Sequence, residues 1–175
     1  MVQALVSREP GARVALPMDG FHRPQRWLDA QPDPAEAHRR RGAPFTFDAE
    51  LFADAVSRAA PRGAALRAPG WDHAAADPVP DAVEVAPSHA VVFPEGNYLL
   101  LDRDPWAGIA PLCTEVWYLD VDPEEAAERL RARHVRAGHS ERDARERAWG
   151  SDADNGRIVR RCRNRATLAI KLPEL

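Results

Sequence analysis

Two carboxylates stand directly after short apolar runs that have the length of strands. Asp19 follows RVALPM and Glu95 follows VVFP, and turn residues come after each acid. Functional groups of α/β proteins gather where parallel strands end. Phosphoryl transfer uses one acid to orient or deprotonate the attacking hydroxyl and another to hold Mg²⁺, directly or through water. Asp19 and Glu95 therefore predict such a site, although acids that cap the turns after strands fit the same spacing.

Arginines outnumber acids from residue 129 to residue 165. Three of them, Arg129, Arg133 and Arg136, are spaced i, i+4 and i+7, which predicts one shared helix face. The guanidinium fork binds phosphate oxygens in a bidentate manner and stabilises developing negative charge. A solvated helix face is the alternative, with ion pairs to the acids Glu125, Glu128 and Asp143.

The histidines do not show the spacing of a metal site. They occur beside acids or beside each other, as His22 near Asp19, His73 after Asp72, and His134 with His139, and none forms a pattern such as HExxH. We therefore expect no dedicated transition-metal site. The tryptophans Trp27 and Trp71 fall in irregular stretches, where they line a pocket or only pack.

Apolar periodicity and turn residues predict alternating strands and helices. Residues 1–7 resemble the end of a helix, and a helical turn is expected over 34–40. The expected longer helices cover 49–60 after the cap Asp48, 123–137, 140–149 and 155–165. The expected strands cover 13–17, 64–68, 83–85, 91–93, 115–121 and 167–172. This alternation predicts an α/β domain with a mostly parallel sheet, in which 115–121 is buried on both faces.

Composition argues for one globular domain over residues 1–175. Hydrophobic residues make up 45% and charged residues 29% of the chain. No apolar run approaches the roughly 20 residues of a membrane span, and the first residues lack the features of a secretory signal peptide. Two cysteines are too few for a disulfide scaffold, so we expect a cytoplasmic location. The net charge of −3 excludes a globally basic nucleic-acid binder.

Several longer blocks resemble one known family. They are PMDGFH (17–22), RRRGAPFTFD (39–48), PGWDHAAADPVPD (69–81), FPEGNYLLLD (93–102) and VWYLDVDPEEAAERLRARHVRAGH (116–139). Together they resemble the phosphoribulokinase/uridine kinase superfamily of P-loop small-molecule kinases. Within it the chain is most similar to bacterial nucleoside/nucleotide kinase-like proteins, which include fructose-transport-associated kinases and relatives of pantothenate kinase.

The resemblance implies an ATP-dependent kinase that acts on a hydroxyl of a sugar, nucleoside or pantothenate-like metabolite, with Mg²⁺ accompanying ATP. It implies that Asp19 is the catalytic acid-base residue and that Glu95 is the acid near Mg²⁺. The substrate loops would be the excursions 21–47 and 69–81, with His22, Arg41, Asp72 and His73 as binding residues. A lid-like region over 129–150 would bring Arg129, Arg133 and Arg136 to the ATP phosphates. Asn155 matches a recurring asparagine whose role stays open.

The sequence also departs from the family. Pro94 replaces an aliphatic residue before Glu95, and Trp71 and His73 replace a smaller aromatic residue and an arginine. The 175 residues hold no GxxxxGK[ST] phosphate-binding loop, and Lys171 is their only lysine. We therefore expect an N-terminally truncated P-loop fold without its first strand, which in these folds lies next to the strand that ends at Asp19. The exposed sheet edges would favour self-association, for example as a homodimer.

Two alternatives remain beside a weakly active or inactive kinase. The first is a pseudokinase that binds a small molecule or a partner without catalysis. The second is nucleic-acid binding through the arginines of 129–165, which we do not expect because no recognised binding fold accompanies them.

Overall fold

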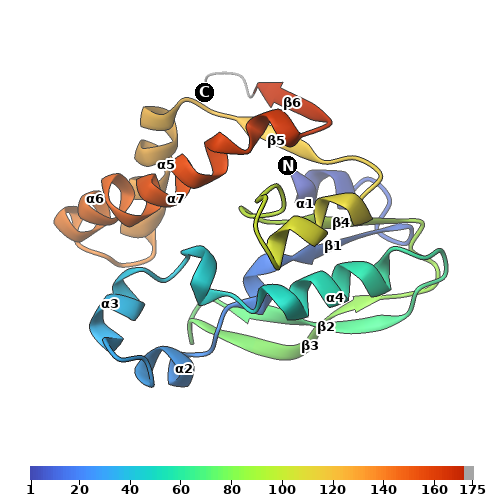
Figure 1. The fold of residues 1–175 in the computed structure, drawn as a ribbon, viewed down its shortest axis with the longest axis horizontal. Coiled ribbons are helices and arrows are strands. Elements are labelled where there is room, and N and C mark those ends of the chain that lie inside the picture. Colours follow the sequence, from blue (N-terminus) through green and yellow to red (C-terminus); the bar gives the residue numbers. More distant parts are fainter. Residues whose placement is uncertain (172–175) are drawn as a thin grey trace.

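The computed structural model of the chain describes residues 1–171, which form six strands and seven α-helices (Figure 1). The strands are β1 (Arg13–Pro17), β2 (Leu66–Asp72), β3 (Asp77–Val85), β4 (Val91–Glu95), β5 (Trp117–Asp120) and β6 (Leu168–Lys171). The helices are α1 (Val2–Val6), α2 (Gln25–Asp29), α3 (Pro34–Arg39), α4 (Ala49–Ala59), α5 (Pro123–Arg136), α6 (Glu141–Trp149) and α7 (Ser151–Arg161). Leu172, the expected end of the last strand, lies outside the described residues.

The strands form three two-stranded sheets. Two of them are parallel, β1 with β4 and β5 with β6, and the third is the antiparallel hairpin β2–β3. Figure 1 shows β1–β4 in the middle of the molecule, the hairpin along one side, and β5–β6 on the opposite side next to α5, α6 and α7. The expectation of an α/β fold with parallel strands is confirmed, because a chain must cross over between parallel partners and here the helices make those crossovers.

Side-chain caps fix where most of the longer helices begin. The Asp48 carboxylate accepts the N–H of Leu51 at the start of α4, and the Asp122 carboxylate accepts two N–H groups at the start of α5. Ser140 accepts the N–H of Asp143 at the start of α6. Helix α7 begins four residues before the expected 155, because Asp152 and Asp154 favour its first turn through the helix dipole.

The hydrophobic core lies between α4, the β1–β4 pair and the turns that follow β4. The fully buried residues Phe21, Phe52 and Tyr98 belong to it, and the rings of Phe21 and Phe52 lie 5.0 Å apart. Because Phe21 and Tyr98 follow β1 and β4 closely, this core holds the carboxyl ends of both strands in place. Tyr118 and Cys162 extend the core toward β5 and α7.

The stretch 69–80, expected as an irregular surface loop, is a β-hairpin. Strand β2 runs to Asp72 and β3 starts at Asp77, with a register shift between Ala68 and Gly70. Proline has no N–H to donate, so within a strand it is found at a bulge or at an edge that has no neighbouring strand. Each strand of a two-stranded sheet has such a free edge. The three prolines of this stretch therefore did not prevent strand pairing, although they suggested a loop.

A cavity of about 740 Å³ lies between the free edges of β4 and β5. Its lining includes all of β4, residues 114–119 and apolar side chains of α1. Within residues 1–171, β4 and β5 each lack a second strand partner on the side that faces this cavity. The prediction that 115–121 is buried on both faces is wrong, because Trp117 and Leu119 line this cavity and are 37% and 39% exposed.

None of the helices within residues 1–171 has the length and apolar character that a bilayer crossing requires.

Candidate active site

Asp19 and Glu95 lie at the carboxyl ends of the neighbouring parallel strands β1 and β4. Pro17, the last residue of β1, is in register with Glu95, the last residue of β4. Asp19 follows two residues later, in the short 3-10 turn Met18–Phe21. The two carboxylates influence each other, because the pKa of Glu95 is raised above its usual range by burial and then by the negative charge of Asp19.

Both carboxylates are free of protein partners. Among residues 1–171, neither side chain accepts a hydrogen bond or forms an ion pair, and Asp19 is exposed. The turn after β1 is closed by the main-chain oxygen of Asp19, which accepts the N–H of His22 at 3.2 Å. The Asp19 side chain therefore does not cap the turn, and its oxygens are available for a proton or a cation.

Gly20 allows the β2–β3 hairpin to approach Asp19. A Cβ atom at Gly20 would lie 2.0 Å from the carbonyl oxygen of Pro69 in β2, so any side chain at this position would push the hairpin away. The sequence Asp19-Gly20 thus combines an available carboxylate with the space for a second wall of the site.

His22 lies between two aromatic rings. Its ring centroid is 3.9 Å from that of Phe47 and 4.5 Å from that of Trp71 in β2. The Nδ1 atom lies 2.8 Å from the main-chain oxygen of Asp19, and because that oxygen can only accept, Nδ1 carries the proton. Burial lowers the pKa of His22, so the neutral ring presents an unprotonated Nε2 at neutral pH.

Arg41 extends this cluster through its contact with Trp71. Its guanidinium carbon lies 4.9 Å from the Trp71 ring centroid, and one of its nitrogens lies 3.9 Å from the Asp77 carboxylate at the start of β3. Trp71 contacts both His22 and Arg41, and Phe47 contacts His22. No motif indicated a role for Phe47, whose only signal was its alternation with Phe45 before the helix cap.

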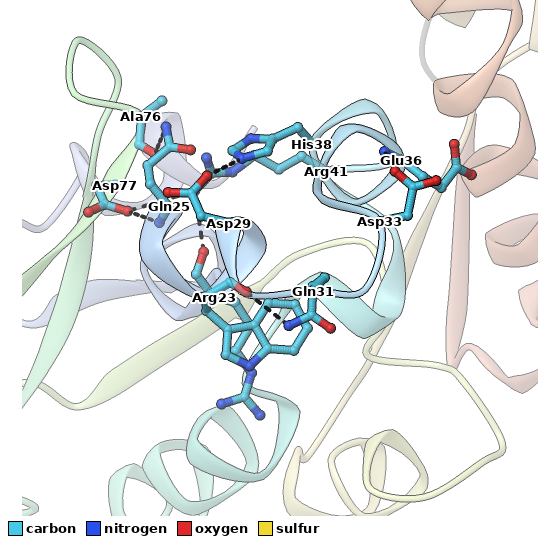
Figure 2. A network of polar contacts seen from close by, with 11 residues as sticks. Arg23, Gln25, Asp29, Gln31, Asp33, Glu36, His38, Arg41, Ala76 and Asp77 are labelled. Carbon is cyan, nitrogen blue, oxygen red and sulfur yellow. Dashed lines mark hydrogen bonds and ion pairs between the residues drawn. The ribbon is translucent and has the colours of Figure 1, made fainter.

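Polar contacts fasten the excursion 21–47 to the hairpin (Figure 2). The Gln25 N–H donates to the Asp77 carboxylate at 2.8 Å, and the Gln25 side chain donates to the carbonyl oxygen of Ala76 at 3.2 Å. Within the excursion, His38 and Asp29 pair at 2.8 Å and join α3 to α2. The two predicted substrate segments therefore form one connected wall beside Asp19.

Asp72 and His73 lie at the turn of the hairpin. The Asp72 carboxylate accepts the N–H groups of Ala74 and Ala75, and these bonds hold the pKa of Asp72 below its usual range. His73 is exposed. The preceding residue Trp71, instead of this pair, contacts the ring of His22.

The three arginines of the predicted lid lie on α5, which follows β5. Arg129 pairs with Glu125 one turn earlier. Arg133 and Arg136 are exposed and form no ion pair within residues 1–171. Helix α5 is joined to α7 by a hydrogen bond of 2.8 Å between His134 and Asp152, and the predicted Asn155 is buried on α7. No contact within the described residues joins the three arginines to the carboxylates.

The carboxylate pair fits Mg²⁺ better than a transition metal. Mg²⁺ keeps several waters and binds through one or two carboxylates together with substrate phosphates, and two oxygen-donor side chains without a basic partner meet that need. Within residues 1–171 no group of three His, Cys, Asp or Glu side chains lies in a position to hold a metal. A cation here would be held by Glu95, directly or through water, and not by a closed protein cage.

Comparison with known proteins places the chain among small-molecule kinases, although no family model matches it. It is 49% identical over 125 residues to the ATP-dependent kinase-like protein notR′ of Aspergillus versicolor, covering 69% of this chain and 73% of that protein. It is 38% identical over 165 residues to the putative uridine kinase C227.14 of Schizosaccharomyces pombe, covering 91% and 68%.

Two solved structures share the fold. The putative fructose transport system kinase of Silicibacter sp. TM1040 has a TM-score of 0.82 and 32% identity, with 95% of this chain and 79% of that chain covered. YFH7 of Saccharomyces cerevisiae, described as a putative P-loop containing kinase with a circular permutation, has a TM-score of 0.80 and 28% identity. This chain covers 59% of the YFH7 chain.

Proposed function

Because the chain belongs to the uridine kinase-like family of P-loop kinases, we propose that it transfers the γ-phosphate of ATP to a hydroxyl group of a small metabolite. The acceptor classes that fit are a sugar, a nucleoside or a pantothenate-like compound. The observation that carries the proposal is the pair Asp19 and Glu95, two available carboxylates at adjoining ends of parallel strands.

Asp19 is the residue that receives the acceptor. Its carboxylate is exposed and unpaired within residues 1–171, so it can accept a hydrogen bond from the attacking hydroxyl. It would take the hydroxyl proton as the new O–P bond forms and the bond between the γ-phosphorus and the bridging oxygen breaks, which releases ADP. The fixed position of Asp19 at the strand end orients that hydroxyl, and the neighbouring His22 and Trp71 restrict where the rest of the acceptor lies.

Glu95 is the residue that would hold Mg²⁺, directly or through water. When bound, the ion neutralises charge on the phosphates and on the two carboxylates. The raised pKa of Glu95 supports this assignment, because a carboxylate that is partly buried beside another negative charge gains most from a nearby cation.

The ATP phosphates would meet arginines of the 129–150 region. Arg133 and Arg136 are exposed and free of ion pairs within residues 1–171, and Arg129 would have to exchange its partner Glu125. We propose that this helical region moves toward the carboxylates when ATP binds, since lids commonly complete kinase sites. His22 and Arg41 would bind the acceptor, and Asp72 and His73 would act through the hairpin turn.

A second candidate function is binding of the small molecule without phosphate transfer. It is favoured by the absence of GxxxxGK[ST] from the 175 residues, in which Lys171 is the only lysine. Backbone N–H groups and a lysine of that motif normally neutralise the phosphates, so we expect slow ATP turnover from these residues alone.

Formation of a phosphorylated product tests the proposal. The chain is incubated with MgATP and single hydroxyl compounds of each acceptor class, and the products are analysed by mass spectrometry. Asp19→Asn should lower product formation by about 10²–10⁴-fold, while Asp54→Asn on the exposed face of α4 should leave it unchanged. Compound binding without any product would favour the second candidate. Near-normal turnover by Asp19→Asn would show that Asp19 is not the base.

A further inference from the structure

Arg41 carries a positive charge inside the site with little to balance it. Its side chain is 16% exposed, and its Nε atom is buried without a partner among residues 1–171. One terminal nitrogen donates to the carbonyl oxygen of Arg23 at 3.3 Å, a long hydrogen bond to a neutral group. Buried arginines are normally paired with carboxylates, because an unpaired buried charge is costly.

Within residues 1–171, the one acid that pairs with Arg41 also binds another group. Asp77 lies 3.9 Å from Arg41, at the outer limit of an ion pair, while the same oxygen accepts the Gln25 N–H at 2.8 Å (Figure 2). Arg23, the other half-buried arginine of the excursion, has its own carboxylate, because Asp48 lies 2.8 Å away. Arg41 thus differs from Arg23 in lacking a carboxylate within 3 Å, although the Nε atoms of both arginines are buried without a partner among residues 1–171.

A continuous row of contacts leads from Arg41 to the proposed base. The guanidinium lies over Trp71, Trp71 contacts the ring of His22, and His22 is bonded to the main chain of Asp19. An acceptor with its reactive hydroxyl at Asp19 would therefore lie along His22 and Trp71 and end near Arg41. The aromatic surface suits a carbon skeleton, and the guanidinium suits oxygens that carry negative charge.

Resting on the kinase function proposed above, we propose that the acceptor is an anionic polyol, a hydroxylated compound with a carboxylate or phosphate group, and that Arg41 binds this anionic group. Arg41 is then a residue that determines specificity. A neutral nucleoside or a neutral sugar would leave its charge without a partner and would bind less tightly.

Matched pairs of compounds test this inference without ATP. D-Gluconate and sorbitol differ in a carboxylate, and D-ribose 5-phosphate and D-ribose differ in a phosphate. Isothermal titration calorimetry with the full chain, at pH 7.5 and constant ionic strength, gives a Kd for each. We expect one anionic compound to bind at least about tenfold more tightly than its neutral partner, the effect of one charge-assisted hydrogen bond, and the pair that shows the difference identifies the anion.

Variants assign the difference to one residue. Arg41→Gln should abolish the preference, and Arg41→Lys should retain part of it because lysine keeps the charge but loses the fork. Arg26→Gln is the control, since Arg26 is exposed in the same excursion and forms no ion pair within residues 1–171. Circular dichroism melting verifies that each variant is folded, and Arg41→Lys decides the matter if Arg41→Gln does not fold.

Two kinds of result would overturn the inference. Equal affinities within both pairs, or no binding of any of the four compounds, would show that the site does not select anions. An undiminished preference in Arg41→Gln would assign the anion to another residue. Because these measurements need no phosphate transfer, a preference that depends on Arg41 in a chain without kinase activity would refute the proposed function alone.

Discussion

Gly96 and Met18 lie so close together that no side chain fits between them. A Cβ atom at Gly96 would lie 2.5 Å from the Cβ atom of Met18. Gly96 follows Glu95 directly and Met18 precedes Asp19 directly. This close approach of two turns therefore brings the carboxyl ends of β4 and β1 together.

Gly96→Ala should destabilise the chain and disturb the carboxylate pair. The added methyl group meets a Cβ atom that cannot rotate away, so a strand end must shift, and such overpacking typically costs about 1–3 kcal/mol. Urea unfolding measures the loss. Gly11→Ala is the control, because a Cβ atom there meets nothing within 4 Å. Equal stability of the two variants would mean that the turns separate without cost.

Local signals in the sequence were sufficient for the longer helices and for the strands that precede Asp19 and Glu95, but not for the short helix α2. Contacts between distant segments were not visible in the sequence. Asp48, Asp122 and Ser140 each marked a helix start, because a cap depends on residues within one turn. The apolar runs before Asp19 and Glu95 identified the strand ends in the same way.

The rest of the site depends on pairing across the chain. The β2–β3 hairpin was not predicted because its prolines are more typical of a loop. In the structure these prolines are compatible with a bulge and with free strand edges. The position of Trp71 between His22 and Arg41 results from that hairpin, so no local pattern predicted it. The exposure of Trp117 results from a cavity whose walls come from two different sheets.

Replacement of Glu95 by glutamine should stabilise the chain at neutral pH. Burial, and then the charge of Asp19, raise the pKa of Glu95 above 4.5 in the folded state. The protonated Glu95 carboxyl therefore contributes to stability below pH 4.5. This contribution is lost as the pH rises through the raised pKa that Glu95 has in the folded state. Glu95→Gln has no proton to lose, so its melting temperature at pH 7 should exceed that of the natural chain, by roughly 1–3 °C.

Thermal melts between pH 4 and pH 8 test this expectation. The difference between Glu95→Gln and the natural chain should grow with pH, whereas Glu146→Gln on exposed α6 should show no such trend. A Glu95→Gln chain that melts below the natural chain at pH 7 would contradict it.

His22 should make the chain less stable in mild acid. Burial is the main cause that lowers the pKa of His22 below 6.5, so the unfolded chain takes up the proton more readily than the folded one. The neutral His22 ring makes its full contribution to stability above pH 6.5. This contribution is lost as the pH falls through the lowered pKa that His22 has in the folded state. His22→Gln should flatten this part of the stability profile, while His73→Gln should not. A titration of the His22 imidazole by NMR gives its pKa directly, and a value above 6.5 would contradict the claim that burial lowers this pKa.

Removal of one hydroxyl should loosen the excursion 21–47. Tyr98 is fully buried, and its hydroxyl donates to the carbonyl oxygen of Gly42 at 2.5 Å. Tyr98→Phe leaves that carbonyl without its donor, which costs about 1–3 kcal/mol. Tyr118→Phe is the matched control, because the Tyr118 hydroxyl forms no hydrogen bond within residues 1–171. Equal urea midpoints for the two variants would show that the bond to Gly42 contributes nothing.

The cavity between β4 and β5 bears on how cooperatively the chain unfolds. No backbone hydrogen bond joins the β1–β4 pair to the β5–β6 pair among the described strands, and Tyr118 of β5 and Cys162 after α7 pack into the same hydrophobic core as β1. Sheets normally transmit unfolding from strand to strand through their hydrogen bonds, so amide protons of the two pairs should exchange with solvent as separate units. The half that contains β5, β6 and α5–α7 can then open while Asp19 and Glu95 remain in place.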